Sequence, residues 1–119
     1  MTRVRTARAE RIAELNDQLR KNPLDRSLGQ VLISSGIVAG GADFQAKVLT
    51  AVARMQRGDF TEGNDSYGER DFNSFAVDAG LCFFKIDYYA KSDLCAPSDD
   101  PADPEKTERI LTVMLADEY

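Results

Sequence analysis

The chain contains no histidine and no tryptophan, and it has only two cysteines among its 119 residues. Without histidine, Ser-His-Asp and Cys-His nucleophile systems and histidine-based proton transfer are excluded. Two cysteines without a histidine cannot complete the usual tetrahedral zinc site. Catalysis would therefore need carboxylate, lysine or tyrosine chemistry, or a carboxylate-bound Mg²⁺ or Mn²⁺ ion.

Long apolar runs are also missing. No segment approaches the roughly 18 consecutive apolar residues of a membrane span, and residues 1–20 are basic but lack the apolar stretch of a secretory signal. We therefore expect a cytoplasmic protein with reduced cysteines, in which Cys82 lies in an apolar run and is buried while Cys95 lies in a polar loop. The length predicts a single domain over residues 1–119, with residues 1–5 as a candidate disordered end.

Charge is divided unevenly along the chain. Residues 1–57 hold ten Lys/Arg and five Asp/Glu, whereas residues 58–119 hold five Lys/Arg and fifteen Asp/Glu. The acidic part is also rich in phenylalanine and tyrosine, which favours a folded acidic surface over a disordered tail. Such a surface attracts basic partners and repels nucleic-acid phosphate.

Hydrophobic periodicity and turn formers predict an ordered series of elements. Apolar residues at steps of three and four predict the helices, and alternation predicts the strands. Asp103-Pro104-Glu105 has the residue types of a helix start, and Gly58 is suited to a left-handed helix end. The expected elements are a helix over 6–21, a strand over 30–34, a helix over 42–57, strands over 73–78 and 81–89 joined by a tight turn, and a helix from Asp103 almost to the end, with Ile110, Leu111, Met114 and Leu115 as its buried stripe.

This order, α-β-α-β-β-α, predicts an α+β fold: a three-stranded antiparallel sheet with helices packed on one face. Alternation along the second hairpin strand places Tyr88 among buried residues and leaves Tyr89 as the better interface candidate. Two acidic loops, residues 59–71 and 90–103, connect the elements, and neither a repeat nor a low-complexity tract is present.

The densest group of polar residues lies in the first acidic loop, at residues 64–71. Its three carboxylates could hold a hard cation through oxygen ligands, but their spacing is not that of an EF-hand. The stronger interpretation is structural, because Asn and Asp close turns and Gly68 supplies a left-handed position. Lys85 and Asp87 are expected to form an ion pair, and their order does not match the acid-acid-lysine arrangement of metal-dependent nucleases. We therefore assign no catalytic residue, metal ligand or cofactor.

Four segments together are similar to a known family. They are Asn64-Asp65-x-Tyr67-Gly68-Glu69-x-Asp71-Phe72, Phe84-Lys85-Ile86-Asp87-Tyr88-Tyr89, Asp100-Pro101-Ala102-Asp103-Pro104 and residues 111–119. In this order they resemble the family called domain of unknown function 3768, over residues 12–119. The family's usual histidine before Asp71 is Arg70 here. The resemblance implies a small alphaproteobacterial protein, often carried on plasmids and other mobile elements, and implies no established activity.

The charge division and this setting together suggest a non-enzymatic binding protein. We expect an inhibitor of CRISPR or restriction machinery, whose carboxylates occupy a basic nucleic-acid-binding surface in place of phosphate. Direct nucleic-acid binding and membrane binding are not expected. The predicted partner-binding residues are Asp59, Glu62, Asp65, Tyr67, Glu69, Asp71, Asp87, Tyr89, Asp99, Asp100 and Asp103.

Three alternatives stay open at this point. One is a carboxylate/Mg²⁺-dependent hydrolase that uses Asp65, Glu69, Asp71 and Asp87. Another is a plasmid DNA accessory factor whose basic N-terminal helix, with Arg3, Arg5, Arg8 and Arg11, contacts phosphate. The third is a homodimer in which the basic helix of one copy meets the acidic loops of the other.

Overall fold

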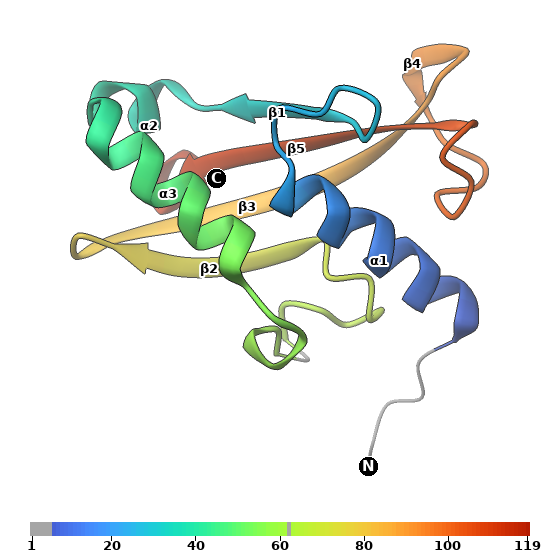
Figure 1. Cartoon of the computed structure of the whole chain (residues 1–119), viewed down its shortest axis with the longest axis horizontal. Helices are drawn as coiled ribbons and strands as arrows, with labels where there is room; N and C mark the ends of the chain where they lie inside the picture. Colours follow the sequence, from blue (N-terminus) through green and yellow to red (C-terminus); the bar gives the residue numbers. More distant parts are fainter. Residues whose placement is uncertain (1–5, 62) are drawn as a thin grey trace.

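A five-stranded mixed sheet forms the centre of the protein in the computed structural model, which describes residues 6–61 and 63–119 (Figure 1). The strands run in the order β1-β5-β3-β2, and β4 pairs with β3 beside this path. β1 is parallel to β5, and the other pairs are antiparallel. The strands are β1 (Gln30–Ile33), β2 (Phe72–Val77), β3 (Gly80–Ala90), β4 (Asp93–Pro97) and β5 (Thr107–Leu115).

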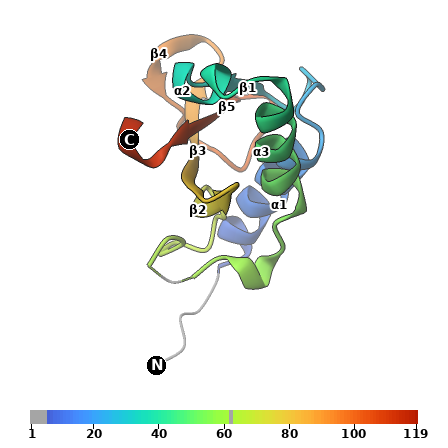
Figure 2. The same cartoon turned by 90° about the vertical axis from the view of Figure 1, so that its left-hand side faces the viewer.

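The helices α1 (Ala7–Lys21), α2 (Ser35–Ala39) and α3 (Ala42–Arg54) lie on one face of the sheet (Figure 2). The Thr6 hydroxyl accepts the Ala9 N–H and begins α1, as expected of a capping threonine. Two 3₁₀ turns, η1 (Arg57–Asp59) and η2 (Ala116–Glu118), follow α3 and β5. None of the helices in the described part of the chain has the length and apolar character needed to span a bilayer.

The core lies between the sheet and the helices. Leu19 of α1 and Val48 and Val52 of α3 pack against the side chains of β3 and β5 that point toward them. Phe84 lies at the centre of this layer, fully buried and edge-on to Phe60 at 6.0 Å between ring centroids. Alternation along β3 therefore works as the sequence predicted, with Cys82, Phe84 and Ile86 buried.

The prediction of a final helix from Asp103 is wrong, because residues 107–115 form the strand β5. Ile110, Leu111, Met114 and Leu115 fit a helical stripe, but the period of two is also present: Thr107, Arg109, Leu111 and Val113 are buried on one side. β5 is paired on both edges, by β1 and β3, so tertiary pairing decides between the two periods. The expected helix start forms a turn instead, in which Asp103 accepts the N–H groups of Glu105 and Lys106.

The three-stranded antiparallel sheet is corrected to five strands for the same reason. The sequence predicts a helix where β5, one of the inner strands, lies, and β4 lies within the expected second acidic loop. The α+β class and the placement of the helices on one face are confirmed.

The structure also tests the predicted element bounds, two glycine positions and the burial of the cysteines. The helix over 6–21, the strand near 30 and the hairpin are confirmed. The helix over 42–57 ends earlier, at Arg54, and Gly58 lies in η1 rather than at a left-handed helix end, whereas Gly68 has the expected positive φ of 75°. Cys82 is buried, Cys95 is exposed, and both are free. The prediction about residues 1–5 lies outside the described residues.

Candidate functional site

The first acidic loop, residues 59–71, folds back against α1 instead of extending into solvent. Asp65 is 4% exposed, and its Oδ1 accepts the Arg70 N–H at 2.7 Å. Gly68 and Arg70 both adopt positive φ, at 75° and 52°, which reverses the chain between them. The turn directs the side chains of Glu69 and Arg70 toward the helix, as the contacts in the next two paragraphs show.

Arg70 bridges the loop to α1 through two carboxylates. Its Nε and Nη2 donate to Asp17 at 3.1 and 2.7 Å, its Nη2 also reaches Glu10 at 3.3 Å, and its side chain is 3% exposed. Asp17 also pairs with the buried Arg20, and Glu10 with Arg57. Burial alone would raise the pKa of Asp17, but the hydrogen bonds from Arg70 and Arg20 outweigh it and lower that pKa.

A second group of polar contacts centres on Tyr88. Its hydroxyl accepts from Asn16 Nδ2 at 2.8 Å and donates to Glu69 Oε1 at 3.0 Å. Arg109 donates to Asn16 Oδ1 at 2.9 Å, and its guanidinium lies 5.3 Å from the centroid of the Tyr88 ring. Burial and the nearby Asp71 and Glu69 carboxylates raise the pKa of Tyr88, so its phenol stays protonated.

These two groups adjoin through the consecutive residues Asn16–Asp17 and Glu69–Arg70, and we treat them as one polar network. The network also reaches the second acidic segment, which we define as residues 91–106. Asn16 donates to the backbone oxygen of Glu69 at 3.0 Å, and Arg109 donates to the backbone oxygen of Pro101. Asn16 of α1 therefore holds the first acidic loop and Arg109 of β5 holds the second acidic segment, and these two side chains are hydrogen-bonded to each other. The polar network is defined by Glu10, Asn16, Asp17, Arg20, Glu69, Arg70, Tyr88 and Arg109.

Asp71 of the first acidic loop has a pKa that is shifted toward neutrality. Burial, with a further contribution from the charge of Glu69, raises the pKa of Asp71 to about 6. Such a group can exchange a proton near physiological pH. In residues 6–61 and 63–119, however, no three His, Cys, Asp or Glu side chains are arranged to hold a metal ion. The hydrolase alternative on Asp65, Glu69, Asp71 and Asp87 thus gains no geometric support.

The predicted partner-binding residues do not lie together. Asp65 is buried, Glu69 accepts a hydrogen bond from the Tyr88 hydroxyl, and Asp71 is partly buried beside them. Asp87 pairs with Lys85 at 3.0 Å, as predicted, on the opposite face of the sheet, where Tyr89 also lies. Glu62 lies outside the described residues.

The remaining predicted residues are nearer to solvent. Asp59 is exposed and caps the Gln56 N–H at 2.7 Å, and Tyr67 is 77% exposed. In the second acidic segment Asp99 is exposed, Asp100 pairs with Arg8 at 3.4 Å, and Asp103 accepts the Glu105 N–H at 2.9 Å. The predicted partner-binding residues therefore form several separate groups in the structure.

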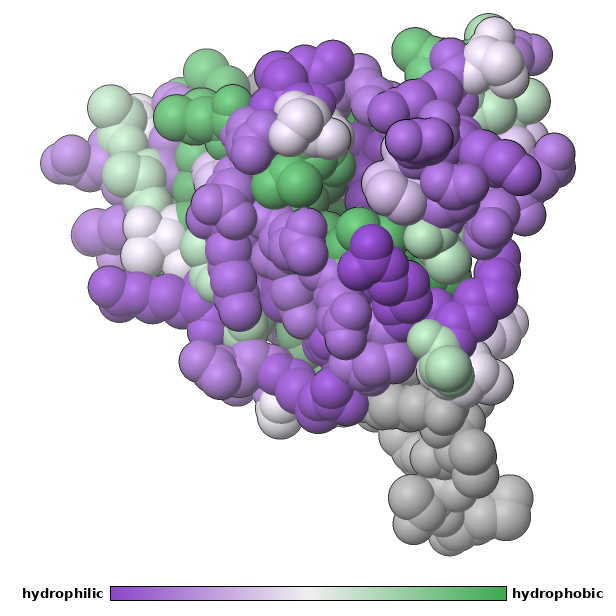
Figure 3. All heavy atoms as spheres, turned by 45° about the vertical axis from the view of Figure 1, so that its right-hand side comes forward, coloured by the Kyte–Doolittle hydropathy of each residue, from purple (hydrophilic) through white to green (hydrophobic). Residues whose placement is uncertain are grey.

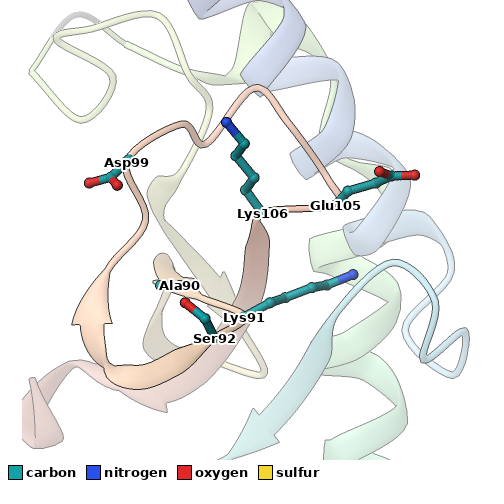
Figure 4. A pocket seen from close by; sticks show the side chains of 6 residues that line it. All are labelled: Ala90, Lys91, Ser92, Asp99, Glu105 and Lys106. Carbon is teal, nitrogen blue, oxygen red and sulfur yellow. The ribbon is translucent and has the colours of Figure 1, made fainter.

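The second acidic segment borders an open hollow of about 510 Å³ (Figure 4). Its charged rim is mixed, with Lys91 and Lys106 beside Asp99 and Glu105. The charged ends do not converge, because Asp99 points to one side and Lys91 and Glu105 point to the other (Figure 4). The hollow is therefore not organised around one ligand group.

Sequence reasoning missed the members of the polar network on α1 and β5. Asn16, Arg20 and Arg109 are each no more than 2% exposed. A usable signal was present, because Asn16 and Arg20 adjoin the apolar positions Leu15 and Leu19, and the period of two places Arg109 on the buried side of β5. Recognising Arg109 required β5 to be predicted as a strand.

Comparison with known proteins agrees with the four motifs. A family model described as protein of unknown function (DUF3768) matches residues 33–118, which include both acidic segments and the strands β2 to β5. No curated protein and no solved structure gives a significant match. The matched range covers well over half of the chain, and the protein accordingly belongs to the DUF3768 family.

Proposed function

We propose that this protein is a non-enzymatic inhibitor that covers a basic, nucleic-acid-binding surface of another protein with its own acidic surface. The partner class is a nucleic-acid-binding complex of host defence, such as a CRISPR effector or a restriction enzyme. The resemblance to a family of mobile elements suggested this class from the sequence. The protein's charge distribution supports the mode of binding.

One observation carries the proposal: the fold removes positive charge from the surface. Arg20, Arg70 and Arg109 are each about 2% exposed, whereas Asp65 is the one carboxylate among the buried residues of the described chain. Burial leaves the net charge at −5, and Arg20 and Arg70 are paired with Asp17 and Glu10. The exposed carboxylates elsewhere on the surface are not offset by these buried arginines, and the resulting acidic field steers a basic partner toward it.

The second acidic segment is the best-placed source of that field. Asp93, Asp99 and Glu105 are exposed there, within thirteen residues of one another. The first acidic loop contributes less, because its carboxylates are committed to the polar network or partly buried. Figure 3 shows that hydrophilic residues cover most of the side on which α1 lies. This arrangement favours docking through residues 91–106.

A gel-shift competition tests the proposal. A purified CRISPR effector or restriction complex is bound to its DNA at low ionic strength, and the protein is then titrated in. We expect release of DNA by the wild type, weakening as salt rises. A variant with Asp93, Asp99 and Glu105 changed to Ser should lose this competition.

The matched control removes the same amount of charge elsewhere. Glu14, Asp25 and Asp43 are exposed and lie outside the acidic segments, so their replacement by Gln, Ser and Ser lowers the charge equally. This variant should compete nearly as well as the wild type. Failure of the wild type to displace DNA from every complex tested at low salt, or equal loss in the two variants, would refute the proposal.

No specific observation favours the DNA accessory factor. Arg8 faces Asp100, and Arg11 lies 3.8 Å from Glu14, so acidic side chains accompany the described arginines of this surface. Arg3 and Arg5 lie outside the described residues.

A further inference from the structure

Part of the second acidic segment, residues 98–103, is fastened to the strands behind it. We call this part the Asp99 loop. Ser98 donates its N–H to the backbone oxygen of Tyr88 on β3 at 3.0 Å. From β5, Arg109 donates to the backbone oxygen of Pro101. The loop therefore has hydrogen bonds to two strands of the sheet.

A ring of hydrogen bonds closes the base of the Asp99 loop. The Asp100 N–H donates to Ser98 Oγ at 3.2 Å, and Ser98 Oγ lies 2.7 Å from Thr107 Oγ1. Thr107 donates to the backbone oxygen of Asp100 at 2.8 Å. Because this bond uses the single hydroxyl proton of Thr107, Ser98 is the donor between the two hydroxyl groups. Hydrogen bonds joined in this way polarise and strengthen one another.

Asp99 lies between the two loop residues that the ring holds. Its side chain is exposed, and its carboxylate points away from Lys91 and Glu105 (Figure 4). Asp100, the next residue, is paired with Arg8 at 3.4 Å. The ring therefore fixes the backbone on both sides of Asp99 and leaves its carboxylate directed into solvent.

The hydroxyl group of Thr107 serves the loop rather than the strand. Thr107 begins β5, pairs with Ala90 and is 4% exposed. A strand at this position needs only a β-branched side chain, which valine also provides. A buried hydroxyl costs stability unless it is hydrogen-bonded, and the partners of this hydroxyl are Ser98 and Asp100 of the Asp99 loop.

We propose that Thr107 is a positioning residue for the docking surface. Its hydroxyl holds the backbone of Asp99, so that the carboxylate is already in place when it meets a basic group of the partner. Association loses affinity when loops and side chains must first be ordered, and a loop that is ordered beforehand avoids this loss. This inference rests on the proposed function, and it identifies a buried, uncharged residue on which docking depends.

Two substitutions separate the hydroxyl from the rest of the Thr107 side chain. Thr107→Val keeps the branched shape and removes the hydroxyl, whereas Thr107→Ser keeps the hydroxyl and removes a methyl group. In the DNA competition, Thr107→Val should raise the concentration needed for half-release about three- to tenfold, and Thr107→Ser should stay within about twofold of the wild type. Melting temperatures measured in parallel verify that both variants are folded. Equal competition by Thr107→Val and wild type would overturn the inference.

Ser98→Ala opens the same ring from the loop and leaves the core unchanged. It should weaken the competition to a similar extent. Ser92→Ala is the matched control, because Ser92 is exposed in the same acidic segment and lies outside the ring. It should stay within about twofold of the wild type. The heteronuclear NOE of the Asp99 amide, measured on the free isotope-labelled protein, should fall in Thr107→Val and Ser98→Ala and be unchanged in Ser92→Ala.

A double-mutant cycle tests whether Thr107 acts through Asp99. Asp99→Ser removes the carboxylate that the ring positions, so adding Thr107→Val to this variant should weaken the competition no further. A purely structural role would give the same factor in both backgrounds. That result, or an unchanged NOE of Asp99 in Thr107→Val, would overturn the inference and leave the proposed function intact. Failure of the wild type to release DNA would instead refute the proposed function, and with it the docking role of Thr107.

Discussion

The two acidic segments of this protein have similar compositions and opposite structural roles. In the first acidic loop, Asp65 and Glu69 point inward, where they hold the loop and Tyr88 in place. In the second acidic segment, Asp93, Asp99 and Glu105 remain exposed. The difference follows from the neighbours: the first loop contains Arg70 and packs on the polar side chains of α1. A count of carboxylates along a sequence therefore does not locate an acidic surface.

The largest expected effect comes from breaking the link between the first acidic loop and α1. Asp17→Ala leaves Arg70 and Arg20 buried without their shared carboxylate, and we expect a loss of about 3 kcal/mol of unfolding free energy. Urea denaturation monitored by circular dichroism measures this. Glu14→Ala, on the exposed side of the same helix, is the control and should cost less than about 0.5 kcal/mol. Similar losses in both variants would show that the buried pairs contribute no more than a surface pair.

The pH dependence of Asp17 has a defined sign. Its folded-state pKa lies below the ordinary 3.8, so its stabilisation is present above that pH and is lost as pH falls through the folded-state value. Asp17→Ala should therefore remove part of the acid sensitivity below about pH 4.

A smaller effect is expected at Tyr88, where the second part of the polar network meets the loop. Tyr88→Phe removes the hydroxyl that bonds both Asn16 and Glu69, and we expect a loss of about 1–2 kcal/mol. The neighbouring Tyr89 lies on the side of the sheet away from the helices, so Tyr89→Phe should change stability by less than about 0.5 kcal/mol. Equal melting temperatures for wild type and Tyr88→Phe would contradict the role given to this hydroxyl.

Asp71 should show the opposite pH behaviour to Asp17. Its folded-state pKa of about 6 lies above the ordinary 3.8, so the folded protein binds the extra proton and becomes less stable as pH rises between these values. Asp71→Asn should abolish this decline and stabilise the protein above pH 6. The gain should be about 1–2 kcal/mol, less than the full shift implies, because the side chain is partly exposed. Melting temperatures measured from pH 4 to 8 test the prediction, which an unchanged profile would contradict.

The smallest effect on stability is expected in the second acidic segment. Changing Asp93, Asp99 and Glu105 to Ser should alter the unfolding free energy by no more than about 0.5 kcal/mol, because these side chains are exposed. The same variant should lose competition with DNA. These substitutions should therefore affect binding without affecting stability, unlike substitutions in the first acidic loop. A large loss of stability would show that these three side chains also stabilise the fold.

Local signals explain which parts of the fold the sequence predicted. The helix with Ile12, Leu15 and Leu19 and the strand with Cys82, Phe84 and Ile86 each show one clear period, and both are present. In β5, Ile110, Leu111, Met114 and Leu115 fit a helical stripe while Arg109 and Leu111 alternate, and pairing with β1 and β3 decides between them. No local pattern carries that non-local information.

The candidate site was predictable only in part for the same physical reason. The turn chemistry of Asn64, Asp65 and Gly68 was visible, and their structural interpretation agrees with the buried Asp65 and the positive φ of Gly68. The direction of Glu69 and Arg70 depends on Asn16, Asp17 and Tyr88, which are distant in sequence. Which carboxylates remain on the surface therefore follows from tertiary contacts.

The contrast between the two acidic segments is tested most directly by titrating the isotope-labelled protein with octalysine at low ionic strength and following backbone amide signals. The account predicts that signals from residues 91–106 shift and return when salt is added, while those of residues 63–71 stay near their starting positions. Shifts concentrated in residues 63–71, with residues 91–106 unchanged, would contradict it.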